Sequence, residues 1–363
     1  MSVDIGIIGL AGSGKTTIFN ALTGSKVATE DATPSLGVAK VPEPRLQVLA
    51  DMLHPKKVVY TEAKYIDIGA SVKGMAEERG IGGKLLSELS QVSALINVVR
   101  TFIDDSVPHI HGTLDVERDI AAINIELAFS DLVIMERRLE RIAVSLKGAT
   151  AAERQGLLRE QELLARIKVN LEKEIPVLEQ GLSDEEYKMI ANYQFLSAKP
   201  LLIVVNAGEE QIPELDVLEA GLNSRYRRTN CRLIALCGKL EQELTQLEGS
   251  DAEIFRAEMG LRESGLDRII RASYELLGLI TFFTIASNEL KAWPLTRGTS
   301  AVRAAGKIHS DMERGFIRAE VVSFNDLIQC GGIAEARKKG LLRLEGKNYT
   351  VQDGDVITFL FNV

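Results

Sequence analysis

The sequence contains few of the features that mark secreted, membrane-bound or metal-cluster proteins. Its 363 residues include 3 cysteines, Cys231, Cys237 and Cys330, which are odd in number and lack metal-ligand spacing, so we expect reduced thiols in or near the core. The longest apolar run, residues 276–286, is too short to span a bilayer. The first residues lack the charged segment and cleavage site of a signal peptide. We therefore expect a cytoplasmic protein without a membrane partner.

The chain also lacks an excess of basic residues. Its formal net charge is −8, which argues against a protein that coats nucleic acid, although a local basic patch is compatible with this charge. No DNA partner is expected. The composition, 45% hydrophobic and 26% charged, is typical of a globular protein, and the length is sufficient for two or three domains.

What the sequence does contain is a glycine-rich loop between an apolar strand and a helix. Residues 3–8 predict a buried strand, and the helical pattern after the loop stops at Gly24. The loop matches G-x-x-x-x-G-K-[ST], and the expected nucleotide-binding residues here are Gly9, Leu10, Ala11, Gly12, Ser13, Gly14, Lys15, Thr16 and Thr17. The N–H groups of such a loop surround phosphate oxygens, next to the positive end of the helix dipole. Lys15 would reach the β- and γ-phosphates, and the Thr16 hydroxyl would bind Mg²⁺.

Two further residues complete the expected magnesium site. The proline-containing residues 25–44 predict a loop, in which Thr33 would act as a switch I threonine; an ordinary surface threonine is an equally good interpretation. Residues 58–68 predict a strand, and Asp67 at its end would support the metal rather than only cap the next turn. The glycine-rich, charged residues 71–84 predict a mobile switch II.

Strand and helix patterns alternate over the first 278 residues. Apolar strands near residues 94–99, 201–205 and 232–236 predict an α/β fold with a mainly parallel sheet covered by helices. Residues 115–146 and 151–178 have helical apolar spacing and dense charge, which predicts an inserted antiparallel hairpin. We expect a nucleotide-binding domain in two parts (1–135 and 196–278), a helical arm (136–195) and a separate C-terminal domain (279–363).

The C-terminal domain has a different pattern from the rest. Short strands, one helix near residues 300–308 and the turn at residues 353–355 predict a β-rich, ubiquitin-like module. Its slight excess of basic residues is a weak indication of RNA binding.

The strand at residues 201–205 ends in a possible base-binding turn, Asn206-Ala207-Gly208-Glu209. GTPases carry Asn-Lys-x-Asp there; because the lysine is missing and the acid is one methylene longer, the clamp on guanine is weakened and adenine should be tolerated better. Gly238, after the next strand, would lie against the base edge by position.

His109 and His111 share the loop at residues 104–112, and by themselves they are most simply solvated loop residues.

Several of these stretches resemble the Obg-like ATPase (YchF) family. They are residues 14–23 (GKTTIFNALT), residues 41–46 (VPEPRL), Asn206-x-x-Glu209, and the closing run from Gly315 to Val356, which is similar to that family's TGS domain. The resemblance covers essentially the full chain. It implies a three-part molecule that hydrolyses ATP in preference to GTP, associates with ribosomes, and positions the attacking water with a histidine, here His109.

The sequence departs from that family in two places. The family has Asn and Val where Gly12 and Ser13 stand, and loss of that asparagine puts potassium-assisted hydrolysis in question. Its Asp-Ile-Ala-Gly-Leu is replaced by Asp67-Ile68-Gly69-Ala70-Ser71, so we expect the switch II contacts to differ from those of the family. We predict a slow, Mg²⁺-dependent ATPase with Lys15 and His109 as catalytic residues, which acts as a nucleotide-switched factor on the ribosome or its RNA. The alternatives are a GTPase of the Obg class and a nucleotide-gated binding module with negligible turnover.

Overall fold

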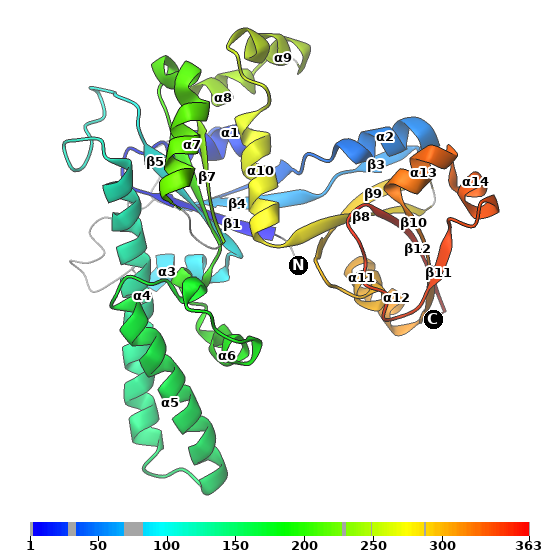
Figure 1. The fold of residues 1–363 in the computed structure, drawn as a ribbon. Coiled ribbons are helices and arrows are strands. Elements are labelled where there is room, and N and C mark those ends of the chain that lie inside the picture. The colour runs from blue at the N-terminus through cyan, green and yellow to red at the C-terminus, as the bar shows by residue number, and fades with distance from the viewer. Residues whose placement is uncertain are drawn as a thin grey trace. The chain divides into compact units, whose positions relative to one another are not determined.

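The computed structural model describes residues 3–27, 34–68, 83–226, 230–247, 249–286 and 288–362 (Figure 1). The chain divides into two compact units. One consists of Val3–Ala39 with Lys64–Ile269, and the other of Lys40–Ala63 with the residues from Ile270 onward. The segment Lys40–Ala63 thus belongs, by its contacts, with C-terminal residues that are more than 200 positions away in the sequence.

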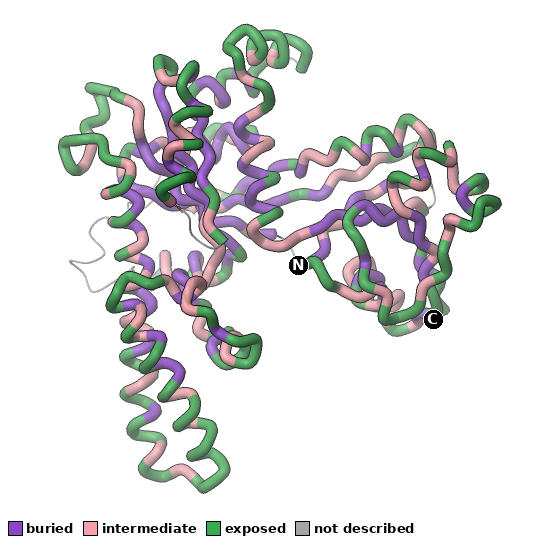
Figure 2. Tube along the Cα trace, viewed as in Figure 1, coloured by how far each residue is buried: buried purple, intermediate pink, exposed green. Residues whose placement is uncertain are grey.

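The first unit is built on a six-stranded sheet of order β2-β4-β1-β5-β6-β7. Neighbouring strands β1, β5, β6 and β7 run parallel, as their registers show. The strands are β1 (Val3–Gly9), β2 (Ser35–Lys40), β4 (Glu62–Asp67), β5 (Ala94–Arg100), β6 (Leu201–Asn206) and β7 (Cys231–Leu236). Every residue of β5 is buried, because helices cover both faces of a parallel sheet (Figure 2). The expected α/β class is confirmed.

The helices associated with this sheet include those predicted after the phosphate loop and over residues 115–146 and 151–178, together with others that the sequence did not predict, such as Leu215–Arg225 and Gly265–Leu276. They are α1 (Lys15–Thr23), α3 (Gly83–Gln91), α4 (Val116–Ser145), α5 (Ala151–Leu171), α6 (Asp184–Ile190), α7 (Leu215–Arg225), α8 (Gly238–Leu244), α9 (Gly249–Glu258) and α10 (Gly265–Leu276). Helix α1 ends at Gly24, whose φ of 65° is left-handed and therefore suits glycine. Short 3₁₀ turns, among them Val177–Glu179 and Leu196–Ala198, join α5 to β6.

Helices α4 and α5 form the long hairpin (Figure 1). Their seam is apolar and includes the fully buried Met135, Ile142 and Leu164. Arg138 donates to both carboxylate oxygens of Glu160 at 2.7 Å, which joins the two helices beside that seam. At the base of the arm, buried Asp131 accepts from the backbone N–H groups of Leu196 and Ser197, and burial raises its pKa to about 6.

Two features of the first 70 residues differ from the sequence prediction. Residues 35–40, expected to be loop, form strand β2. The single strand expected over residues 58–68 is two strands in two sheets, β3 (Lys57–Val59) and β4, of which β3 pairs with β9. Both differences depend on partner strands that are distant in sequence, so local alternation could not reveal them.

The second unit holds a six-stranded sheet of order β11-β10-β12-β8-β9-β3. Its remaining strands are β8 (Leu279–Ala286), β9 (Glu289–Thr296), β10 (Phe316–Ser323), β11 (Arg343–Glu345) and β12 (Asp355–Phe361), and its helices are α2 (Pro44–Leu53), α11 (Ala301–Ile308), α12 (Ser310–Arg314), α13 (Phe324–Cys330) and α14 (Ile333–Lys338). Helix α2 buries Leu46 and Leu49 against Phe283, and Arg45 pairs with Glu43 and Asp353. The β-rich character was predicted, whereas α12, α13 and α14 were not.

Two expectations about the whole chain can be compared with the structure. The three cysteines are free thiols, and Cys237 is buried. Within the described ranges, no helix is both long and apolar enough to cross a membrane.

Candidate functional site

The glycine-rich loop connects the end of β1 to the start of α1. Gly9 has φ 152° and Gly14 has φ 90°. A Cβ atom on Gly9 would lie 2.4 Å from the Val98 carbonyl oxygen, and one on Gly14 would lie 2.1 Å from the Asn206 side-chain nitrogen. Only glycine is accommodated at these two positions, because the backbone conformation and the close neighbours both exclude a side chain.

Lys15 folds back over this loop. Its ammonium donates to the carbonyl oxygens of Gly9 at 3.1 Å and Leu10 at 2.9 Å, and the residue is 8% exposed. Burial lowers the pKa of Lys15 to about 8, and the charge of Asp67 partly opposes this shift. A buried ammonium that is solvated only by carbonyl dipoles would be stabilised by an anion such as phosphate.

Thr16 and Asp67 provide the oxygens for a metal ion. The Thr16 hydroxyl donates to Asp67 Oδ2 at 2.7 Å. Asp67 Oδ1 is buried and has no hydrogen-bond partner within the described residues, and burial raises the pKa of this carboxyl. A hydroxyl beside an unsatisfied carboxylate oxygen suits Mg²⁺, which prefers oxygen ligands. Thr33, the third expected metal residue, lies outside the described residues.

Asn206, the last residue of β6, holds the phosphate loop in place from two strands away in the sheet. It is 4% exposed, its amide donates to the Ser13 carbonyl at 3.0 Å, and its Oδ1 accepts from the Gly238 N–H at 2.9 Å. Asn206 therefore ties the phosphate loop to the β7–α8 turn, where a Cβ on Gly238 would clash with Ile18 and Asn206. The sequence placed Asn206 and Gly238 at the nucleotide, but their mutual bond could not be read from it.

Glu209, the other expected base-binding residue, forms an ion pair with Lys239 at 2.7 Å. Both side chains are more than half exposed, and they project from the turns after β6 and β7. Lys239 was not among the residues predicted to bind the base. The only available signal was its position directly after Gly238.

His109 is held more firmly than a solvated loop histidine. Its Nε2 lies 2.8 Å from Asp119 Oδ2, its side chain is 6% exposed, and its Nδ1 accepts from the His111 N–H. Because Nδ1 accepts, the proton of the neutral ring resides on Nε2 and is donated to Asp119. Arg118 also donates to Asp119. His109 and Asp119 line the same small cleft as Leu10 and Ser13 of the phosphate loop.

Arg100 is a site residue that sequence reasoning missed. It is 3% exposed, and its guanidinium donates to the carbonyls of Val107 at 2.7 Å and Gly12 at 3.4 Å, and also to those of Phe102 and Asp104. It therefore connects the loop before His109 to the phosphate loop. The signal in the sequence was a charged residue at the end of a mainly apolar strand.

This combination of fold and site defines a P-loop NTPase. The first strand of the mainly parallel sheet leads into a glycine-rich loop and a helix. Lys15, Thr16 and Asp67, which such enzymes use for phosphate and Mg²⁺, converge at that loop. The chain belongs to the YchF family of these enzymes.

Comparison with known proteins supports the family over the full length. The "Ribosome-binding ATPase YchF" of Bacillus subtilis is 41% identical over 372 residues and that of Escherichia coli O157:H7 37% over 377 residues, each with 100% of both chains covered. Residues 4–135 match the "50S ribosome-binding GTPase" family, and residues 279–362 match YchF-GTPase_C, a family described as a protein of unknown function. The solved Schizosaccharomyces pombe YchF GTPase superposes with a TM-score of 0.84 at 26% identity, covering 99% of this chain and 98% of that one.

Proposed function

We propose that this protein binds Mg·ATP in preference to GTP and hydrolyses it slowly. The observation that carries the proposal is the convergence of the buried Lys15 ammonium, the Thr16 hydroxyl and the unsatisfied Asp67 oxygen at one end of β1 and β4. Bound Mg²⁺ would neutralise charge on the phosphates. Lys15 would stabilise the charge that develops on the γ-phosphate, and the backbone N–H groups of the loop would orient it.

Preference for ATP rests on the turn after β6. Asn206 is committed to Ser13 and Gly238, and the Glu209 carboxylate is held by Lys239, so neither is free to form a two-point clamp on guanine. A site without that clamp has little basis for selecting guanine. The second candidate, a GTPase, is favoured only if guanine displaces Lys239 from Glu209.

Parallel titrations with Mg²⁺ and fluorescent ATP and GTP analogues, checked by competition with unlabelled nucleotide, test this preference. We expect tighter ATP binding. In Lys239→Ala we expect GTP affinity to rise several-fold, because Glu209 is released, while ATP affinity stays within twofold. Lys173→Ala, at an exposed lysine of the arm, is the control. A clear GTP preference in the unmodified protein would overturn the ATPase assignment but not the phosphate site.

His109 is proposed to position the attacking water, which requires it to leave Asp119 when nucleotide binds. His109→Ala should then lower kcat by about 100-fold or more, since a positioned general-acid or general-base group usually contributes roughly 10²- to 10⁴-fold, with little change in KM. His111→Ala is the matched control, because it alters the neighbouring exposed histidine of the same loop. Steady-state turnover is measured for both variants. An unchanged kcat in His109→Ala would contradict the proposal that His109 positions the water.

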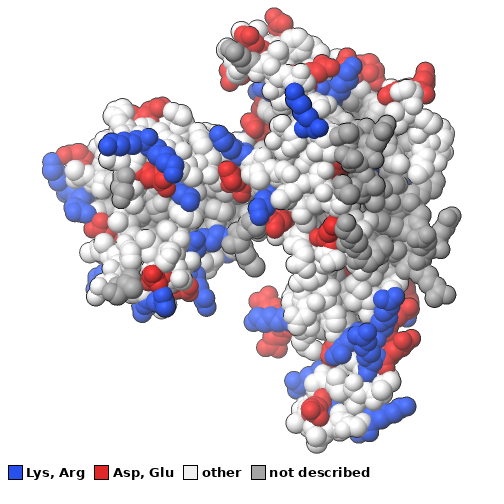
Figure 3. All heavy atoms as spheres, turned by 180° about the vertical axis from the view of Figure 1, so that it is seen from behind, with Lys and Arg blue, Asp and Glu red and all other residues white. Residues whose placement is uncertain are grey.

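Association with the ribosome is proposed from the names of the relatives, which are described as ribosome-binding. Figure 3 shows charges of both signs intermingled on the arm and on the second unit, so the described residues of that face form no single basic patch. We expect the protein to co-sediment with ribosomes through a sucrose cushion, and to a different extent with ATP than without nucleotide. Absence from the ribosomal pellet under both conditions would refute this part of the proposal.

A further inference from the structure

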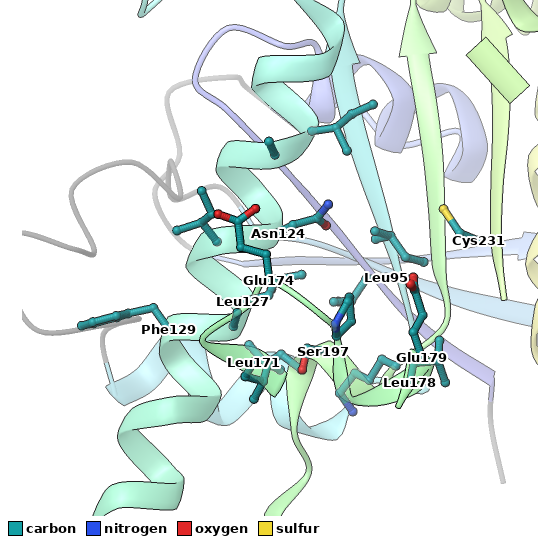
Figure 4. Close-up of a pocket in the computed structure, with 18 of the residues that line it drawn as sticks. Leu95, Asn124, Leu127, Phe129, Leu171, Glu174, Leu178, Glu179, Ser197 and Cys231 are labelled. Carbon is teal, nitrogen blue, oxygen red and sulfur yellow. The ribbon is translucent and has the colours of Figure 1, made fainter. Parts of the chain in front are cut away.

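A second cavity lies in the first unit at the edge of the sheet away from the phosphate loop. It has a volume of about 290 Å³ and is bounded by α4, the residues after α5 and the starts of three strands. Leu201 and Cys231 are the first residues of β6 and β7 and line it, whereas Asn206 ends β6 at the nucleotide edge (Figure 4). The cavity is therefore separate from the nucleotide site, at the lower end of the size range of small-molecule pockets.

The wall of this cavity is mostly apolar. Ile120, Leu127 and Ala128 of α4 face Leu171 and Leu196 across it. Ile120 is fully buried, and Leu127, Leu171 and Leu196 are nearly so. A ligand in this space would need an aliphatic or aromatic body.

The charged groups among the described residues of the wall are mainly acidic. Of its described residues, three carry carboxylates (Glu172, Glu174 and Glu179) and one, Lys199, carries an ammonium. Lys199 donates to the carbonyls of Ser90 at 3.1 Å and Val92 at 2.6 Å, so its charge is already satisfied by backbone oxygens.

Glu174 is the carboxylate best suited to meet a ligand. Its backbone adopts a left-handed conformation, φ 62°, just after α5, and its N–H donates to the Leu171 carbonyl. Within the part of the chain that the structure describes, its carboxylate has neither an ion pair nor a hydrogen bond. Asn124 of α4 lines the same cavity and likewise has no hydrogen bond among those residues (Figure 4).

We propose that this cavity binds a small amphiphilic cation, such as a primary alkylammonium compound. Its apolar body would lie between α4 and the strand starts, and its ammonium would donate to the Glu174 carboxylate and the Asn124 amide oxygen. Among the described residues of the wall, an anion of the same shape would meet three carboxylates and one ammonium, that of Lys199, which backbone carbonyls already hold. The proposal is independent of the proposed function, because no nucleotide-binding residue takes part.

Isothermal titration of the full chain with decylammonium, below its micelle concentration and with decanoate as the matched anion, tests the proposal directly. We expect one decylammonium per chain and at least tenfold weaker binding of decanoate. Glu174→Gln should weaken decylammonium binding about fivefold to tenfold without affecting the fold, because the residue is exposed. Glu162→Gln, at an exposed carboxylate of α5 outside the cavity, should leave binding unchanged.

A second variant tests the cavity itself. Ala128→Trp places an indole in the space and should abolish binding, with circular dichroism and thermal melting confirming that the variant is folded. Equal binding of decylammonium and decanoate, several cations bound per chain, or unchanged binding in Glu174→Gln would each overturn the proposal, whatever the outcome for Ala128→Trp.

Discussion

Lys15→Met is expected to weaken ATP binding at least 100-fold, about 2.7 kcal/mol, and to reduce turnover further. The substitution keeps the length of the side chain but removes the buried charge that Gly9 and Leu10 hold over the phosphate loop. Competition titration and steady-state hydrolysis measure the two effects. Lys173→Met, at an exposed lysine of the arm, is the control, and an affinity within threefold of the unmodified protein would contradict the role given to Lys15.

The pKa of Lys15 gives this expectation a distinct pH dependence. Its pKa is lowered from 10.5 to about 8 by burial, and only the protonated form attracts phosphate. Bound phosphate raises that pKa, so binding takes up a proton above pH 8 and affinity falls, by up to tenfold per pH unit, as pH rises from 8. Below pH 7 Lys15 is fully protonated, so its charge makes its full contribution to ATP affinity. Lys15→Arg stays charged over this range and should give a flatter profile, although with lower affinity.

Asn206→Ala is expected to lower the free energy of unfolding by about 2–4 kcal/mol. The change leaves the Ser13 carbonyl and the Gly238 N–H without a partner in a buried position. Asn223→Ala is the control, because that exposed asparagine makes one hydrogen bond within the described residues, to the Leu233 carbonyl. Denaturant unfolding gives the free energy.

A local measurement distinguishes the loss of the Asn206 hydrogen bonds from a general loss of stability. Hydrogen exchange at the Gly238 amide should accelerate in Asn206→Ala, because its acceptor is lost, before amides in the centre of β5 are affected. If Asn206→Ala lowers the free energy of unfolding by less than about 0.5 kcal/mol and leaves hydrogen exchange at Gly238 unchanged, the hydrogen bonds of Asn206 contribute little to stability.

Features whose signals are local could be predicted from the amino-acid sequence alone. The phosphate loop was predictable because Gly9, Gly14 and Lys15 serve steric and charge requirements that are met within a few residues. The apolar runs at β1, β5, β6 and β7 and the helical spacing of α4 and α5 likewise carry their own periodicity. These signals were sufficient for the fold class and the phosphate site.

Only the tertiary structure decided what depends on distant partners. Residues 57–59 join the second sheet because Val58 pairs with Leu290, more than 200 residues away. Three features bring together groups from different elements: the buried contact of His109 with Asp119, the hydrogen bonds of Asn206 to the Ser13 and Gly238 backbone, and the mainly apolar cavity beside α4. Periodicity and spacing describe one element at a time, whereas these contacts exist only after the elements have packed.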